Sequence, residues 1–171
     1  LTSLYQKERL FFLLHFGLVY VEEETKDGQM QLQKHIMRYP QYFATRAIEE
    51  TIEKGLKKGV IWHTQGSGKT ALSYFNIRYL TYYFSKQGVV PQFYFVVDRL
   101  DLAEQAFKEF TKRGLKVKRI NKPQELNQKQ DGYNVAVVNI QKFKDSSDLT
   151  DHSGYNLNRQ NIYFIDEAHR S

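Results

Sequence analysis

The sequence contains no cysteine, which excludes disulfide bonds and thiolate metal sites. No apolar run approaches the roughly 18 to 20 residues that a membrane-spanning helix requires. The first twenty residues lack the basic start and the small-residue cleavage site of a secretory signal. The five histidines are scattered, and the chain shows no internal repeat and no low-complexity tract. These absences predict a soluble intracellular protein with no membrane partner.

The composition is that of a globular protein with a basic surface. Of the 171 residues, 41% are apolar and 15% aromatic, which is enough for the core of one domain. The net charge is +6, and residues 108–122 hold seven basic side chains against the single acid Glu109. The basic residues are Lys108, Lys112, Arg113, Lys116, Lys118, Arg119 and Lys122. Such a segment either faces nucleic-acid phosphates or forms a solvated helix surface, and both interpretations stay open.

The first sixty residues show helix and hairpin signals. A capping-box pattern with apolar residues at helical spacing predicts a helix over 3–16. Two short segments on either side of Asp27-Gly28, within 18–32, predict a β-hairpin. Pro40 suits the first turn of a second helix, which the Lys57-Lys58-Gly59 sequence should end.

Beyond residue 59 the pattern alternates between strand and helix. Short apolar runs without in/out alternation are typical of strands covered on both faces. The predicted strands are 60–62, 93–97, 117–120, 135–138 and 162–165, the predicted helices 69–86 and 100–113, and the turn-rich segments 121–134 and 144–160. This order predicts an α/β fold with a parallel sheet. The aromatic residues of the 69–86 helix recur at the spacing of a buried face, so we expect packing rather than base stacking.

The stretch GVIWHTQGSGKT at 59–70 has the elements of a phosphate-binding loop. Its glycines allow backbone N–H groups to surround phosphate oxygens, its lysine can reach the outer phosphates, and its threonine hydroxyl can bind Mg²⁺. The predicted nucleotide-binding residues are Gly66, Ser67, Gly68, Lys69 and Thr70. His63 stands where the strict pattern GxxxxGK[ST] has its first glycine, so a glycine-rich turn with a chance lysine is the alternative.

A second motif, IYFIDEAHRS at 162–171, removes most of that alternative. A buried-strand run ends in Asp166 and Glu167. One carboxylate is placed to hold Mg²⁺ and the other to orient or deprotonate the attacking water. Taken alone, two carboxylates at a strand end could be a solvated turn. Two motifs in this order, about a hundred residues apart, predict binding of ATP with Mg²⁺.

Together these motifs resemble a known family. GSGKT followed by DEAH resembles the first RecA-like motor domain of a superfamily 2 helicase. The stretches RYPQYFATRAI, IWHTQGSGKT, VVDRLDLAEQ, NIQKF and DEAHRS resemble the R subunit of type I restriction enzymes, the HsdR family. The resemblance implies a P-loop NTPase fold, a RecA-like parallel sheet flanked by helices. We expect a helix and hairpin lead-in at 1–38 and a motor domain at 39–171, truncated after DEAH.

The resemblance also implies roles for residues at the nucleotide. Lys69 and Thr70 become the phosphate and Mg²⁺ contacts, Asp166 the metal carboxylate, and Glu167 a catalytic residue together with Lys69. Gln41 matches the glutamine that reads the adenine edge in related motors, with an ordinary polar residue on a helix surface as the alternative.

Further residues match motifs that line the nucleic-acid track in such motors. They are Arg99, Gln105 and Gln141, and a structural role for Arg99 is equally open. From the basic segment we add Lys112, Arg113 and Lys116 as candidate phosphate contacts. His169 matches the residue that links the hydrolytic site to the track, with a solvated strand-end histidine as the alternative.

The expected function is that of an ATP-dependent DNA translocase motor within a type I site-specific deoxyribonuclease. The resemblance implies duplex DNA, methyltransferase and specificity subunits, and a second RecA-like domain as partners, in the cytoplasm of a bacterium or archaeon. The nuclease should lie before Leu1, because no aspartate precedes the Glu24-Thr25-Lys26 sequence to complete a metal pair. Without the second domain, the fragment should be inactive. The alternatives are another DNA or RNA helicase, or a nucleotide-gated binding module without turnover.

Overall fold

The computed structural model describes residues 6–25, 27–64, 66–122, 125, 132–143 and 159–166. Its internal contacts divide the chain into two units, Leu1–Tyr79 and Leu80–Ser171. The division falls inside helix α3 (Lys69–Ser85), which begins in the first unit and ends in the second. Within the described parts, no helix has the length and hydrophobicity that crossing a bilayer would demand.

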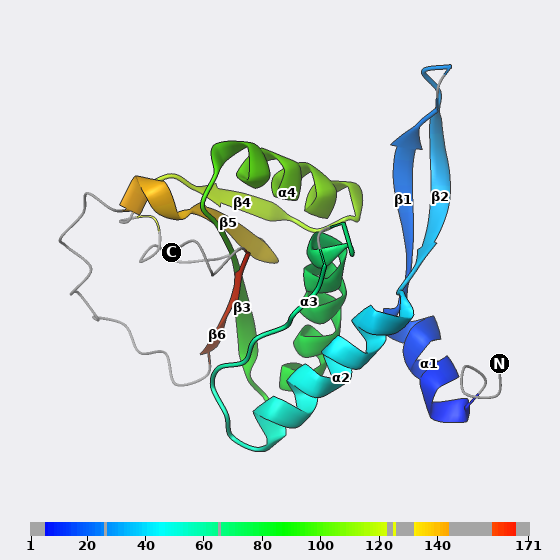
Figure 1. Cartoon of the computed structure of the whole chain (residues 1–171), viewed down its shortest axis with the longest axis vertical. Coiled ribbons are helices and arrows are strands. Elements are labelled where there is room, and N and C mark those ends of the chain that lie inside the picture. The colour runs from blue at the N-terminus through cyan, green and yellow to red at the C-terminus, as the bar shows by residue number, and fades with distance from the viewer. Residues whose placement is uncertain are drawn as a thin grey trace. The chain divides into compact units, whose positions relative to one another are not determined.

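The first unit combines helices with one hairpin (Figure 1). Its elements are α1 (Lys7–Phe16), β1 (Leu18–Glu24), β2 (Met30–Ile36), α2 (Tyr39–Glu53) and the first part of α3. The two strands are antiparallel, in a register that pairs Leu18 with Ile36 and Glu24 with Met30, which confirms the predicted hairpin. Gly28 in the connecting turn has a φ of 76°, a conformation that favours glycine. Pro40 lies in the first turn of α2, as predicted.

Aromatic packing and hydrogen bonds hold the helices of this unit together. The ring of Phe12 in α1 lies 5.3 Å from that of Tyr42 in α2 and 4.9 Å from that of Tyr79 in α3. The guanidinium of Arg78 donates to the carbonyl oxygens of Leu18 at 2.7 Å and His15 at 3.0 Å. The predicted lead-in therefore packs against the helix that follows the phosphate-binding loop. A domain boundary at residue 38 stays a prediction.

The second unit is a parallel four-stranded sheet in the order β4-β5-β3-β6. Its elements are β3 (Val90–Val97), α4 (Leu100–Lys112), β4 (Val117–Ile120), β5 (Val135–Asn139), the 3₁₀ helix η2 (Ile140–Phe143) and β6 (Arg159–Ile165). These strands cover four of the five predicted ones, and the sheet confirms the predicted α/β fold.

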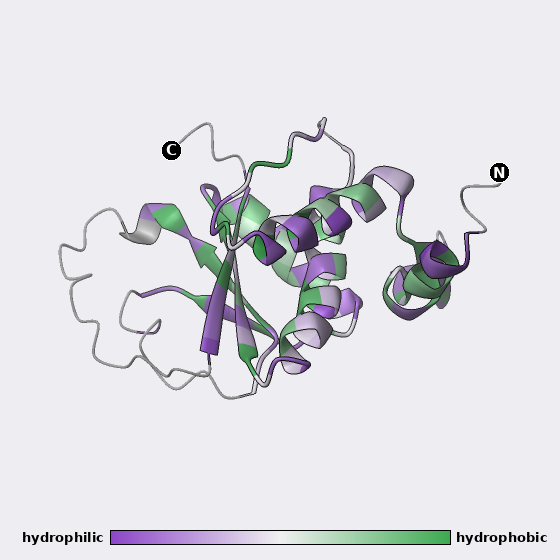
Figure 2. Ribbon diagram, turned by 90° about the horizontal axis from the view of Figure 1, so that it is seen from below, coloured by the Kyte–Doolittle hydropathy of each residue, from purple (hydrophilic) through white to green (hydrophobic). Residues whose placement is uncertain are grey.

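The apolar strands build a core on both faces of this sheet. β5 is buried along its whole length, and it is the green strand that leads into η2 in Figure 2. On one face, Phe110 of α4 is fully buried and its ring lies 5.2 Å from that of Phe95. Because side chains alternate along a strand, Tyr94 points to the opposite face, where it packs with Ile120 and Val138.

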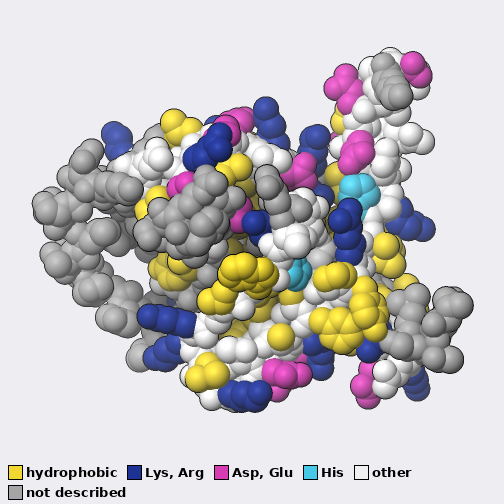
Figure 3. Space-filling model, viewed as in Figure 1, with side chains coloured by type: hydrophobic (Ala, Val, Ile, Leu, Met, Phe, Trp, Pro, Cys, Tyr) yellow, Lys and Arg dark blue, Asp and Glu magenta, His cyan; other side chains and the backbone are white. Residues whose placement is uncertain are grey.

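The strand predicted at 60–62 is not formed. This segment has no regular secondary structure, and Val60 and Trp62 are 90% and 92% exposed. Hydrophobic side chains reach the surface in several places, yellow in Figure 3. An apolar run becomes a strand only when a neighbouring strand pairs with its N–H and C=O groups, and no described strand pairs with this one. The segment is apolar, as the sequence shows, but its apolar side chains do not indicate whether a partner strand lies beside it.

Candidate nucleotide and nucleic-acid sites

The phosphate-binding loop has the backbone geometry that its sequence predicts. Gly66 and Gly68 have φ angles of 75° and 82°, and the Ser67 N–H donates to the Thr64 carbonyl at 3.2 Å. α3 begins at Lys69 immediately after the second glycine, so the predicted loop-to-helix junction is confirmed. The N–H groups of a first helical turn have no intrahelical acceptor and point beyond the helix end. This arrangement favours an anion.

Two buried atoms near this loop have no hydrogen-bond partner among the described residues. They are the hydroxyl oxygen of Ser67 and Nδ1 of His63, which stands in the place of the usual first glycine. Lys69 and Thr70 are half-buried in the first turn of α3. An unpartnered hydroxyl, a lysine and a threonine at a helix N-terminus are donors and ligands that suit a Mg²⁺-bound triphosphate.

Gln41 lies against this loop, although 27 positions separate it from Gly68 in the sequence. Its side-chain Nε2 donates to the Gly68 carbonyl at 3.0 Å, and its Oε1 accepts from the Arg38 N–H at 2.8 Å. The side chain is buried, with 2% of the residue exposed. The alternative of an ordinary surface residue is therefore wrong, while reading of the adenine edge stays a prediction.

Asp166 directly follows β6, at the carboxyl end of the sheet in the second unit. Its backbone N–H donates to the Val96 carbonyl at 3.0 Å, which extends the pairing of β6 with β3. Glu167 and His169 lie outside the described residues. Across the described ranges, no three His, Asp or Glu side chains are grouped to hold a metal. Mg²⁺ in nucleotide sites commonly has only one or two protein carboxylates, because phosphates and water complete its coordination.

The predicted track residues lie around α4 and η2. Arg99 is the N-cap residue of α4, and its guanidinium pairs with both carboxylate oxygens of Asp101, at 3.1 and 2.7 Å. Gln105 is exposed on α4, and Gln141 is exposed at the start of η2. The N–H of Gln141 donates to Asn139 Oδ1 at 2.9 Å. Contact of these three residues with nucleic acid stays a prediction.

The basic segment is partly neutralised within its own unit. Glu104, which precedes the segment in sequence, pairs with Lys108 at 3.5 Å and with Arg119 at 2.5 Å. The guanidinium of Arg113 pairs with Glu109, and only 9% of that arginine side chain is exposed. Among the described residues, Lys112 and Lys116 have no ion-pair partner. Of the three predicted phosphate contacts, these two are therefore better candidates than Arg113.

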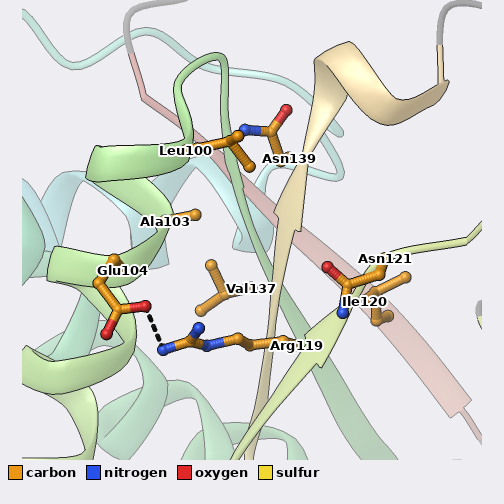
Figure 4. A pocket seen from close by; sticks show the side chains of 8 residues that line it. All are labelled: Leu100, Ala103, Glu104, Arg119, Ile120, Asn121, Val137 and Asn139. Atoms are coloured by element: carbon orange, nitrogen blue, oxygen red, sulfur yellow. Dashed lines mark ion pairs between the residues drawn. The ribbon is translucent and has the colours of Figure 1, made fainter.

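A cavity of about 180 Å³ lies between α4 and the carboxyl ends of β4 and β5 (Figure 4). It is lined by Leu100, Ala103, Glu104, Arg119, Ile120, Asn121, Val137 and Asn139. Asn139 is buried, and its Nδ2 has no acceptor among the described residues. This asparagine belongs to the NIQKF motif, in which no role was predicted for it. The sequence signal that could have drawn attention to Asn139 is a single amide at the end of an otherwise apolar strand.

Comparison with known proteins identifies the family. The model of the SWI2/SNF2 ATPase family matches residues 40–171. A type I restriction enzyme endonuclease subunit of Staphylococcus aureus strain MSSA476, SauMSSORF170P, is 36% identical over 141 residues, 79% of this chain and 14% of that protein. The HindI endonuclease subunit of Haemophilus influenzae is 30% identical over 186 residues, 100% of this chain and 17% of that protein.

These matches confirm the resemblance to the type I restriction enzymes that the motifs indicate. The chain spans between 11% and 17% of the lengths of the curated relatives it matches. With the family model covering its residues from Pro40 onward, the chain belongs to the SWI2/SNF2 ATPase family.

Proposed function

We propose that this chain is the ATP-driven DNA translocase motor segment of a type I restriction endonuclease R subunit. The observation that carries the proposal is the loop of Gly66 to Gly68, which leads directly into α3 and contains the Ser67 hydroxyl, a buried group with no hydrogen-bond partner among the described residues. The family supplies the ATPase class, and the names of the relatives supply the restriction context.

Each residue has a specific part in this proposal. The Lys69 ammonium binds the outer phosphates, while first-turn N–H groups of α3 donate hydrogen bonds to other phosphate oxygens. Thr70 and Asp166 provide the oxygen ligands for Mg²⁺. Glu167 orients the attacking water and takes its proton. Bound Mg²⁺-ATP supplies the phosphoryl group whose transfer to water drives movement along duplex DNA.

The proposed contacts with nucleic acid lie on the surface around α4. Arg99, Gln105 and Gln141 would line the track, and Lys112 and Lys116 would bind backbone phosphates. Phosphate contacts position a nucleic acid without reading its sequence, so recognition would fall to the specificity subunit. The methyltransferase subunit and a second RecA-like domain in the parent chain are the other expected partners. We expect this assembly to work in the cytoplasm of a bacterium or archaeon.

The test is a steady-state phosphate-release assay on the parent subunit, with duplex DNA, with RNA and without nucleic acid. Duplex-stimulated hydrolysis that Lys69→Ala abolishes is the expected result. Glu167→Gln should retain Mg²⁺-ATP binding and lose turnover, because the amide is a poor base. Stimulation by RNA alone would make the protein an RNA helicase, and binding without turnover would make it a nucleotide-gated module.

A second measurement concerns the 171-residue chain by itself. We expect it to bind nucleotide but not to hydrolyse it at a meaningful rate. An arginine supplied from a second domain is worth roughly 10³ to 10⁵ in rate in phosphoryl-transfer enzymes. DNA-stimulated turnover equal to that of the parent subunit, at any protein concentration, would contradict this expectation.

A further inference from the structure

Both polar atoms of the Gln41 side-chain amide form hydrogen bonds within the protein. This amide joins the start of α2 to the last glycine of the phosphate-binding loop, through the hydrogen bonds at 2.8 and 3.0 Å. We propose that Gln41 is a positioning residue for this loop, which sets the loop's shape for a triphosphate whatever base the nucleotide carries. This inference rests on the proposed nucleotide-binding function and assigns a role that reading of the adenine edge does not include.

The two partners of Gln41 define which way its amide points. The Arg38 N–H is a donor, so it must face Oε1, and the Gly68 carbonyl is an acceptor, so it must face Nε2. Gln41 is the third residue of α2, the position from which a side chain reaches back to the N-cap N–H. The α2 cap therefore holds the amide in the orientation that aims its N–H at the loop.

The Gly68 carbonyl is fixed from two sides. It accepts the Gln41 Nε2–H, and it also accepts the first helical bond of α3, from the Leu72 N–H at 2.9 Å. In a trans peptide the N–H of the next residue points opposite to the carbonyl. Anchoring the Gly68 carbonyl thus sets the direction of the Lys69 N–H, one of the first-turn groups that an anion would meet.

Steric contact makes the same pair interdependent. Gly68 has a φ of 82°, and a Cβ atom at this position would lie 2.9 Å from Gln41 Nε2. That distance is shorter than carbon and nitrogen atoms tolerate without a shift. The glycine therefore suits this position in two ways, through its backbone conformation and because a Cβ atom would displace the Gln41 amide from its hydrogen-bonded place. Burial keeps water from replacing either hydrogen bond, because only 2% of Gln41 is exposed.

The test distinguishes an effect of Gln41 on binding of the triphosphate from an effect on binding of the base. Gln41→Glu keeps an acceptor for the Arg38 N–H but replaces the donor facing Gly68 with an oxygen. Calorimetric titration of the parent subunit would compare Mg²⁺-tripolyphosphate, which has no base, with Mg²⁺-ATP. We expect the affinity for tripolyphosphate to fall about tenfold, the effect of losing one buried hydrogen bond. Gln33→Glu, an exposed site on β2, is the matched charge control and should change nothing.

Two outcomes would overturn the inference. If Gln41→Glu weakens ATP binding and leaves tripolyphosphate binding unchanged, Gln41 reads the base alone. If neither affinity changes, the hydrogen bond to Gly68 has no part in binding. Failure of the unsubstituted subunit to bind either ligand, or full binding by Lys69→Ala, would instead refute the proposed function.

A measurement on the unsubstituted protein covers the case in which Gln41→Glu does not fold. In the nucleotide-free protein, a side-chain amide proton of Gln41 should exchange slowly with solvent, because it is buried and bonded to Gly68. Exchange as fast as that of the exposed Gln33 side chain would overturn the inference.

Discussion

The hydroxyl of Tyr79 in α3 donates a hydrogen bond to Glu49 Oε1 in α2. Arg46 pairs with the other oxygen of this carboxylate. Burial, followed by the hydrogen bond to Glu49, raises the pKa of Tyr79 far above its usual value, so the phenol remains a neutral donor. α2 is thereby tied to α3 at Tyr79 through Glu49, and to Gly68, directly before α3, through Gln41.

We predict that Tyr79→Phe lowers the free energy of unfolding by about 1–3 kcal/mol, because it leaves a buried carboxylate oxygen without its donor. Chemical denaturation measures the change. Tyr20→Phe is the matched control on the exposed hairpin face, and it should stay within about 0.5 kcal/mol of the original protein. Equal losses in the two variants would contradict a stabilising role for the Tyr79–Glu49 bond.

We predict that replacing both Lys112 and Lys116 with alanine in the parent subunit weakens DNA binding similarly for unrelated sequences. Each lost phosphate contact should reduce the slope of log affinity against log salt by about 1. Arg113→Ala should behave differently. Its guanidinium is engaged by Glu109, so its loss should destabilise α4 and leave the salt slope unchanged. An unaltered slope in the double variant would indicate that Lys112 and Lys116 lie on a solvated surface and do not contact DNA.

A third prediction concerns alkaline pH. Burial raises the pKa of Tyr133 to about 12, compared with about 10 in an unfolded chain. Between these values the folded protein retains a proton that the unfolded chain has lost, so stability falls as pH rises. Tyr133→Phe should remove this part of the loss, measured as the difference between the two denaturation curves from about pH 9 to pH 12. Identical pH dependence would show that Tyr133 titrates normally.

A fourth prediction uses the only tryptophan of the chain. Trp62 is 92% exposed and lies four positions before Gly66, so iodide should quench its fluorescence strongly in the 171-residue chain. Val60→Ser should leave stability within about 0.5 kcal/mol and reduce aggregation, because it removes an exposed apolar side chain. Weak quenching would mean that this segment packs against other parts of the protein in solution.

Much of the fold follows from local sequence. The helix predicted from residue 69 begins at Lys69, and the strand predicted at 117–120 spans Val117–Ile120. Glycine conformation, apolar runs and helix termini are properties of a few adjacent residues, so they can be read in the linear chain. The junction between the glycine-rich loop and α3 was predicted for the same reason, while phosphate binding by this loop stays a prediction.

Other features depend on residues that only folding brings together. The apolar run at 60–62 lacks a described partner strand, Glu104 neutralises Arg119 from outside the basic segment, and Gln41 reaches Gly68 across 27 positions. Strand pairing, ion pairing and burial are each decided by what lies on the other side of a contact. The sequence by itself therefore determined the glycine-rich loop before α3 and the order of most elements. Only the tertiary structure decided that Gln41 is buried against the glycine-rich loop, because that contact joins α2 to a loop 27 positions away, and no local pattern encodes it.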